Sequence, residues 1–232
     1  MAADARGLVV VLALWGSVLF AQTVPFVGCE SSGQVENLPS PKAESRALPI
    51  SSGDAAGLAY YASADGVAVL GPRGWYCEGN SGSGGSALYL SPSPIRKPFE
   101  GFAIEFDHTT SENSGRYEIA EMMGRLFPEY RACAKHVYAT MDSPLPARPY
   151  PHDILTYRGK TVVEFRTPPR TKGLGTASTW LRKNGGPVLG VVMLVGEGPD
   201  MVQVSVRLPR ELHRLTTAII RQAEREAAIP GH

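Results

Sequence analysis

Two carboxylate–imidazole pairs stand next to predicted strands of this 232-residue chain. Asp107-His108 follows the strand predicted at 102–106, which contains Glu105. His152-Asp153 opens another strand. Carboxylate and imidazole groups can act as general acid and base or bind a metal. Adjacent residues on a strand point to opposite faces, so neither pair forms a site by itself. They form a shared site only if the two strand ends are neighbours in space; otherwise they are ordinary polar residues at strand ends.

Residues 79–82 read GNSG, which has the residue types of the nucleophile loop of trypsin-like serine proteases. The triad of those enzymes runs His, Asp, Ser along the chain. All five histidines follow Ser81 in this sequence: His108, His136, His152, His213 and His232. A trypsin-like site is therefore excluded, and the esterase motif G-x-S-x-G lacks its last glycine here. We interpret Ser81 as a serine of a glycine-rich turn, with an anion-binding nest of backbone N–H groups as the alternative.

Trp180 lies in a long polar connection, residues 167–187, among several cations. An aromatic ring among cations in a long loop can contact an anionic partner, and it can equally anchor the loop while the charges remain solvated. The candidate binding residues are Trp180, Arg182 and Lys183.

Charge and cysteine content exclude several classes of protein. The 23 Lys and Arg residues nearly balance the 22 Asp and Glu residues, and no basic run is interleaved with aromatics, so we predict no nucleic-acid partner. The three cysteines form no CxxC pair and have no zinc-site spacing. No phosphate-binding loop is present either, because the glycine-rich stretch lacks the Lys and the following helix that such loops need. We therefore predict neither a metal nor a cofactor.

Residues 7–21 form an apolar run, GLVVVLALWGSVLFA, that ends on a small residue. The run is too short for a comfortable membrane span and has the length of a signal-peptide core. We predict a signal peptide over 1–21 and an exported protein, periplasmic or extracellular, with no transmembrane span after cleavage. The alternatives are a cytosolic protein whose first helix is apolar, and a lipoprotein anchored at Cys29 in the sequence FVGC.

In an oxidising compartment, three cysteines favour one disulfide and one free thiol. Cys29 and Cys77 lie in loop-like flanks, so we predict a bond between them. Cys133 lies in a helical segment, where a free cysteine commonly packs as a small apolar residue.

The hydrophobic pattern predicts an extended arm over 22–50, one α+β domain over 51–228 and a tail over 229–232. The predicted order is α-βββ-αα-ββ-ββ-α, with an antiparallel sheet of about six or seven strands and helices packed on it. The predicted helices begin at Ser52, Ser114, Pro128 and Pro209, and the predicted strands include 67–70, 87–90 and 102–106. Two hairpins turn at 158–160 and 197–200. In the last strand, Val202, Val204 and Val206 are predicted to face inward, and Gln203, Ser205 and Arg207 outward.

Several stretches resemble a family of exported bacterial proteins that has no assigned activity. They are PFVGCESSGQ, YYASADGVAVLGPRGWYC, SALYLSPSPI, YPHDILTYRGKTVVEF and VQVSVRLP, and the resemblance covers most of residues 25–228. It implies export, a single domain and cysteines at both matching positions, and it supplies no catalytic residue. The segment GVAVLGPRGW is also similar to the strand–Pro-x-Gly-Trp opening of the fold shared by the photosystem II extrinsic oxygen-evolving subunits and several small bacterial lipoproteins. Proteins of that fold are mostly accessory or binding modules.

These observations together predict a non-enzymatic binding or accessory module of the cell envelope, whose partner is an envelope protein or a ligand of unknown identity. The alternative is a hydrolase that uses Asp107, His108, His152 and Asp153.

Overall fold

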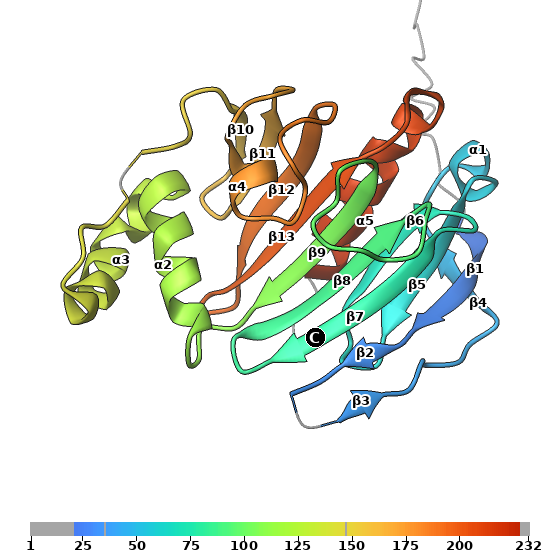
Figure 1. Cartoon of the computed structure of the whole chain (residues 1–232), viewed down its shortest axis with the longest axis horizontal. Coiled ribbons are helices and arrows are strands. Elements are labelled where there is room, and N and C mark those ends of the chain that lie inside the picture. The colour runs from blue at the N-terminus through green and yellow to red at the C-terminus, as the bar shows by residue number, and fades with distance from the viewer. Residues whose placement is uncertain (1–20, 35, 147, 228–232) are drawn as a thin grey trace, which may run out of the picture.

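The computed structural model describes residues 21–34, 36–146 and 148–227 of the chain, which form a mixed α+β structure with two sheets (Figure 1). The larger sheet has nine strands. In spatial order they are β10 (Ile154–Arg158), β11 (Val162–Thr167), β12 (Val188–Val195), β13 (Asp200–Arg207), β9 (Ala103–Thr109), β8 (Gly85–Ser91), β7 (Tyr76–Gly82), β2 (Ser31–Ser32) and β3 (Asn37–Leu38). The smaller sheet has the order β4 (Ser45–Leu48), β1 (Gln22–Cys29), β5 (Leu58–Ser63) and β6 (Ala68–Pro72).

Each face of the larger sheet is covered by different elements. One face packs against the smaller sheet and against α5 (Thr216–Ala227), which places Ile219, Ile220 and Ala223 in the core between them. The other face packs against α2 (Gly115–Leu126) and α4 (Leu174–Ala177). The remaining helices are α1 (Ser52–Ala55), α3 (Arg131–Tyr138), and the 3-10 turns η1 (Pro128–Tyr130), η2 (Ala139–Met141) and η3 (Arg210–Leu215). The central strands are therefore buried on both faces.

The prediction of α+β architecture is confirmed, as are both C-terminal hairpins, β10–β11 and β12–β13. The apolar positions predicted for α2 are buried, with Ile119, Met122, Met123 and Leu126 each at most 5% exposed. The prediction of one sheet with six or seven strands is wrong. Residues of the predicted extended arm contribute β1 to β4, and β1 lies between β4 and β5 in the smaller sheet. A single sequence does not reveal the partner of a strand so remote along the chain.

The helix predicted from Ser52 is also wrong beyond its first turn. Ser51 caps α1 by accepting a hydrogen bond from the backbone amide of Asp54, and α1 ends at Ala55. Residues 58–63, LAYYAS, form β5, of which every residue is buried. The alanines favour a helix, but the paired tyrosines suit a strand and the tertiary environment decides.

GNSG belongs to a strand and not to a turn. It lies in β7, and the chain reverses one step later, where Gly82 pairs with Gly85. Gly79 is needed because a Cβ there would meet the Ser31 side chain of neighbouring β2. Ser81 lines a shallow surface hollow with Gly33 and Gln34. No histidine is among the described residues that border that hollow.

The predicted disulfide between Cys29 and Cys77 is present, with a Cα–Cα distance of 5.5 Å. Cys133 is free, but its predicted burial is wrong, since it lies on the exposed side of α3. Through the described segments, no helix combines the length and apolar character that a membrane crossing requires. The predicted signal peptide (apart from Ala21) and the predicted tail lie outside the described residues.

Candidate functional site

A row of polar side chains crosses the middle of the larger sheet on the face that carries α2 and α4. Glu105 and Asp107 are two residues apart on β9, so they point to the same face. On neighbouring β13, Gln203 is the pairing partner of Asp107 and Ser205 that of Glu105. Gln203 and Ser205 were predicted to face outward, yet both are buried, and they and Glu105 are each at most 2% exposed. That prediction is wrong because α4 and its following loop cover the row.

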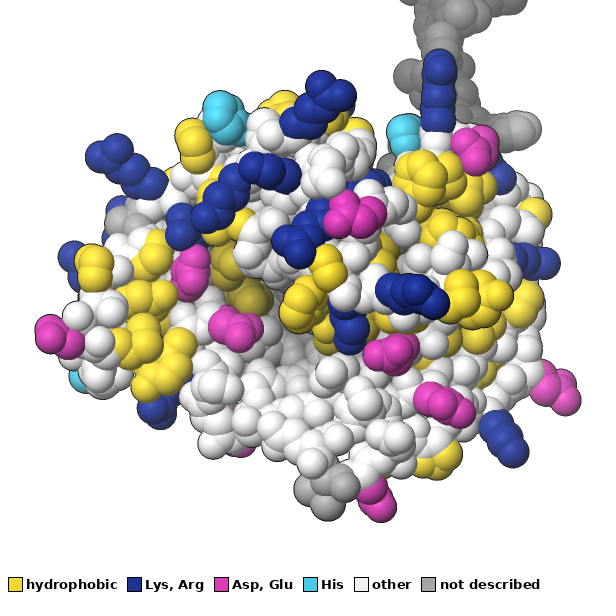
Figure 2. Space-filling view, in the orientation of Figure 1, with side chains coloured by type: hydrophobic (Ala, Val, Ile, Leu, Met, Phe, Trp, Pro, Cys, Tyr) yellow, Lys and Arg dark blue, Asp and Glu magenta, His cyan; other side chains and the backbone are white. Residues whose placement is uncertain are grey.

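The row forms the floor of a cavity of about 440 Å³ between the sheet, α2 and residues 177–180. Figure 2 shows the hollow, with acidic side chains beside it. The lining residues are Glu105, Asp107, Thr109, Glu118, Glu121, Met122, Tyr150, Ala177, Ser178, Thr179, Trp180, Met201 and Gln203. Four of them are carboxylates and none is a cation. The volume is within the range of small-ligand sites.

Asp107 is the most unusual group of the cavity. Its Oδ2 atom is buried and has no hydrogen-bond partner within the described part of the chain. Burial, followed by the charge of Glu118 on α2, raises the pKa of Asp107 from 3.8 to about 7, and Lys97 acts in the opposite direction. A buried polar atom without a partner is rare in folded proteins and calls for an explanation.

Glu105 stands beside it and is held in place by the loop above. Its Oε2 accepts a hydrogen bond of 2.8 Å from the backbone amide of Trp180. Burial raises the pKa of Glu105 well above its usual value, and the charge of Asp107 adds to the effect, while the Trp180 amide and Lys97 lower it. Lys97 itself is occupied, because its ammonium lies 4.1 Å from the centre of the Tyr89 ring and 3.5 Å from Glu78.

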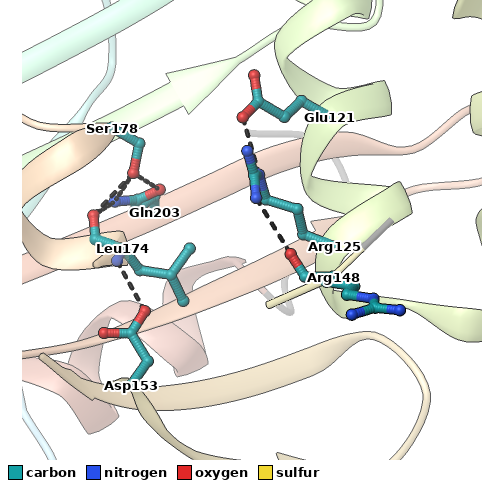
Figure 3. Close-up of polar contacts among 7 residues, drawn as sticks. All are labelled: Glu121, Arg125, Arg148, Asp153, Leu174, Ser178 and Gln203. Atoms are coloured by element: carbon teal, nitrogen blue, oxygen red, sulfur yellow. Dashed lines mark hydrogen bonds and ion pairs between the residues drawn. The ribbon is translucent and has the colours of Figure 1, made fainter. Parts of the chain in front are cut away.

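One wall of the cavity is α4 and the loop after it. Asp153 binds the start of α4: its Oδ2 accepts from the Leu174 amide at 2.8 Å and its Oδ1 from the Thr167 hydroxyl at 2.6 Å. Ser178 closes the helix by donating to the Leu174 carbonyl at 2.7 Å, and the Gln203 amide donates to Ser178 at 3.2 Å (Figure 3). This network joins α4 to the floor of the cavity.

The opposite wall is α2, which contributes Glu118, Glu121 and Met122. Arg125 lies one turn after Glu121 and donates to it at 2.9 Å and to the carbonyl of Arg148 at 3.1 Å (Figure 3). The same guanidinium lies 4.5 Å from the centre of the Tyr150 ring. Arg125 therefore holds Arg148 and Tyr150 against α2.

Trp180 lines the cavity and keeps 49% of its surface exposed. Its loop is held from both sides. Phe99 and Leu181 form a β-bridge. Arg207 was predicted to face outward, and that prediction is wrong: it is 2% exposed and donates from all three of its guanidinium nitrogens to backbone carbonyls. Those carbonyls belong to Gly101, Arg182 and Gly186. The indole is thus presented at the cavity by a braced loop.

The structure separates the two predicted carboxylate–imidazole pairs. Asp107 lines the acidic cavity, whereas His108 faces the other side of the sheet, 3.7 Å from Asp200 and beside a second cavity of about 220 Å³. Asp153 uses both oxygens to anchor α4, and His152 is exposed. Neither His152 nor Asp153 lines either cavity.

Sequence reasoning missed Glu118, Glu121, Ser178 and Gln203 as cavity residues. A signal for part of this set was present, because β9 and β13 both carry polar residues at every second position of otherwise apolar runs. Two such strands that pair place a polar row inside the molecule when both faces of the sheet are covered.

The arrangement suits an organic cation. No cluster of three or more His, Cys, Asp or Glu with metal-binding geometry occurs in the ranges that the structure describes. A carboxylate with a buried, unpartnered oxygen, further carboxylates around it and an aromatic ring at the edge are the groups that bind ammonium ions.

Comparisons with family models, with curated proteins and with solved structures found no match to this chain.

Proposed function

We propose that this chain is an exported binding module that holds a small organic cation, an alkylammonium group, in the acidic cavity. The observation that carries the proposal is the buried, unpartnered Oδ2 of Asp107, which a bound ammonium would satisfy. Burial weakens solvent screening, so a cation gains more from these carboxylates than it would at an open surface.

Trp180 adds a second recognition element. Its half-exposed indole borders the same cavity, and an ammonium near an indole face gains about 0.5–2 kcal/mol. Lys97, which acts electrostatically on both Asp107 and Glu105, is held by Tyr89 and Glu78, outside the set of lining residues. At pH 8, where Asp107 is mostly ionised, no cation among the lining residues neutralises the cavity.

Export is part of this proposal and rests on three supports. The apolar run 7–21 has the length and the small final residue of a signal peptide. The disulfide between Cys29 and Cys77 is of the kind that persists in oxidising compartments. The resemblance to exported bacterial proteins points the same way. The likeness of GVAVLGPRGW to a fold of accessory and binding modules supports an accessory role in the cell envelope.

The binding test is isothermal titration calorimetry with butylammonium at pH 8, with butanol as the neutral ligand of similar size. We expect butylammonium to bind and butanol not to bind. Asp107→Asn removes the charge with little change in shape, and we expect it to weaken butylammonium binding at least about tenfold. The matched control is Asp142→Asn, an exposed position whose backbone φ of 50° asparagine tolerates.

The affinity also depends on pH in a defined direction. Asp107, with a pKa of about 7 in the free protein, is mostly protonated at pH 6 and mostly ionised at pH 8. A cation binds the ionised form, so we expect affinity to rise across this range and binding below pH 7 to release a proton. Equal affinity for butylammonium and butanol, or equal affinity in Asp107→Asn and the wild type, would contradict the proposal.

A hydrolase is the second candidate, favoured by the same carboxyl group. A pKa near 7 suits a general acid or base at neutral pH, and Glu105 supplies a second carboxyl on the same face. Turnover of chromogenic esters or glycosides by the wild type, lost in Asp107→Asn and kept in Asp142→Asn, would favour the hydrolase. Binding of butylammonium without turnover favours the binding module.

A further inference from the structure

A further hollow, lined by cations and called the basic hollow below, adjoins the acidic cavity. Its volume is about 540 Å³, and its lining residues are Glu100, Lys172, Thr176, Ala177, Arg182, Lys183 and Asn184. Ala177, on α4, lines both hollows. Figure 2 shows Lys and Arg side chains gathered above the acidic hollow on the same face of the molecule. The two hollows are therefore neighbours along one short stretch of chain.

Positive charge exceeds negative charge in this basic hollow. Arg182 lies 3.9 Å from Glu100, which also accepts a hydrogen bond of 2.8 Å from Asn184. Lys172 and Lys183 have no ion pair with any described residue. Two ammonium groups thus remain available for an anion, and Asn184 offers an amide beside them.

We propose that the ligand is a zwitterion, with its ammonium group in the acidic cavity and its carboxylate or phosphate in the basic hollow. This inference rests on the proposed function and names the class of ligand for that site. The two hollows carry opposite charge and meet at Ala177, so one molecule with separated charges can satisfy both.

Charge also supplies discrimination. A simple alkylammonium leaves Lys172 and Lys183 without a counter-charge, and a simple anion is repelled by the four carboxylates of the neighbouring cavity. A molecule with both charges avoids both losses, which is how paired charges set specificity in binding sites. Ala177, which lines both hollows, has a small side chain and is exposed.

The experiment compares ligands of equal chain length by calorimetry at pH 8 and constant ionic strength. One series consists of ω-amino carboxylates with four to eight carbons, and the other of the corresponding alkylammonium ions. We expect at least one ω-amino carboxylate to bind about tenfold more tightly than its alkylammonium partner. The chain length with the largest difference reports the distance between the two subsites. Aminoalkyl phosphates of that length then distinguish a phosphate from a carboxylate ligand.

The variant Lys172→Gln/Lys183→Gln tests the basic hollow directly. We expect it to abolish the advantage of the ω-amino carboxylate while leaving alkylammonium affinity unchanged or slightly stronger. The matched control is Lys42→Gln/Lys135→Gln, which neutralises two exposed lysines that line neither hollow. Thermal melts of both double variants confirm that they fold.

The outcomes separate the two proposals. If alkylammonium ions bind but no ω-amino carboxylate binds more tightly, the zwitterion inference is overturned and the cation-binding function stands. The same holds if the advantage survives in Lys172→Gln/Lys183→Gln. If neither series binds, the cation-binding function fails and this inference fails with it.

Discussion

Asp107 is held in a state that does not favour folding at neutral pH. A carboxylate with one buried, unpartnered oxygen loses hydration without a full set of hydrogen bonds in return. Glu105 and Glu118 face it from β9 and α2, and Lys97 is the cation that offsets part of this cost. Groups with such perturbed pKa values gather at functional sites. The unfavourable placement is the reason that a ligand is expected here.

This placement predicts how stability depends on pH. Asp107 has a pKa raised from 3.8 to about 7, so its protonated form favours the folded state. The stabilisation is complete below about pH 4 and is lost as pH rises through 7. Asparagine is neutral throughout. The free energy of unfolding of Asp107→Asn should therefore increase relative to that of the wild type as pH rises from 4.5 to 8. We expect this increase to be at most on the order of 2–4 kcal/mol.

Urea denaturation at the two pH values measures this difference, with Asp142→Asn as the control for a surface carboxylate. A difference between Asp107→Asn and the wild type that stays constant from pH 4.5 to 8 would show that Asp107 titrates normally.

At the scale of elements, α4 depends on a residue outside it. A four-residue helix has little stability of its own, so the contacts of Asp153 with Leu174 and Thr167 must place it. We expect Asp153→Ala to lower the free energy of unfolding by about 1–3 kcal/mol and to weaken alkylammonium binding, because residues 177–180 follow directly. Asp153→Asn keeps one acceptor and should restore part of both losses.

Hydrogen exchange measured by mass spectrometry checks this assignment. Peptides that cover α4 and residues 177–180 should exchange faster in Asp153→Ala, whereas peptides from α5, on the other face of the sheet, should not change. Unchanged exchange at α4 would mean that the helix is held by other contacts.

The elements that could be predicted are those whose pattern is local. The hairpins β10–β11 and β12–β13 were predicted because each turn lies between two apolar runs, and α2 because its apolar residues recur at helical spacing. β5 was not predicted, because alanines in LAYYAS favour a helix until a neighbouring strand buries them. Only part of the candidate site could be predicted from the sequence, for a related reason. Glu105 and Asp107 could be seen on one strand, but α2 and the loop at 177–180 are brought over them by tertiary structure alone.

Across the whole molecule, the disulfide joins the two sheets. Cys29 is the last residue of β1, in the smaller sheet, and Cys77 belongs to β7, in the larger one. The chain also joins the two sheets at this point. Before Glu30, β1 pairs with β5 of the smaller sheet, and after Glu30, β2 pairs with β7 of the larger sheet. Both cysteines pack in the core between the sheets, which is separated from the acidic cavity by the larger sheet itself. Stability and binding should therefore respond differently to the loss of this bond.

We expect Cys29→Ser/Cys77→Ser to lower the free energy of unfolding by about 4 kcal/mol, the value expected for a closed loop of this length with a sequence separation of 48. Where the variant remains folded, its affinity for butylammonium should stay within about twofold of the wild type, because none of the residues that line the cavity belongs to the core that the bond supports. Urea denaturation and calorimetry measure the two quantities, with Cys133→Ser as the control for a free, exposed thiol. A loss of affinity in proportion to the loss of stability would mean that the two faces of the larger sheet are coupled, and that the acidic cavity needs the joined sheets to keep its shape.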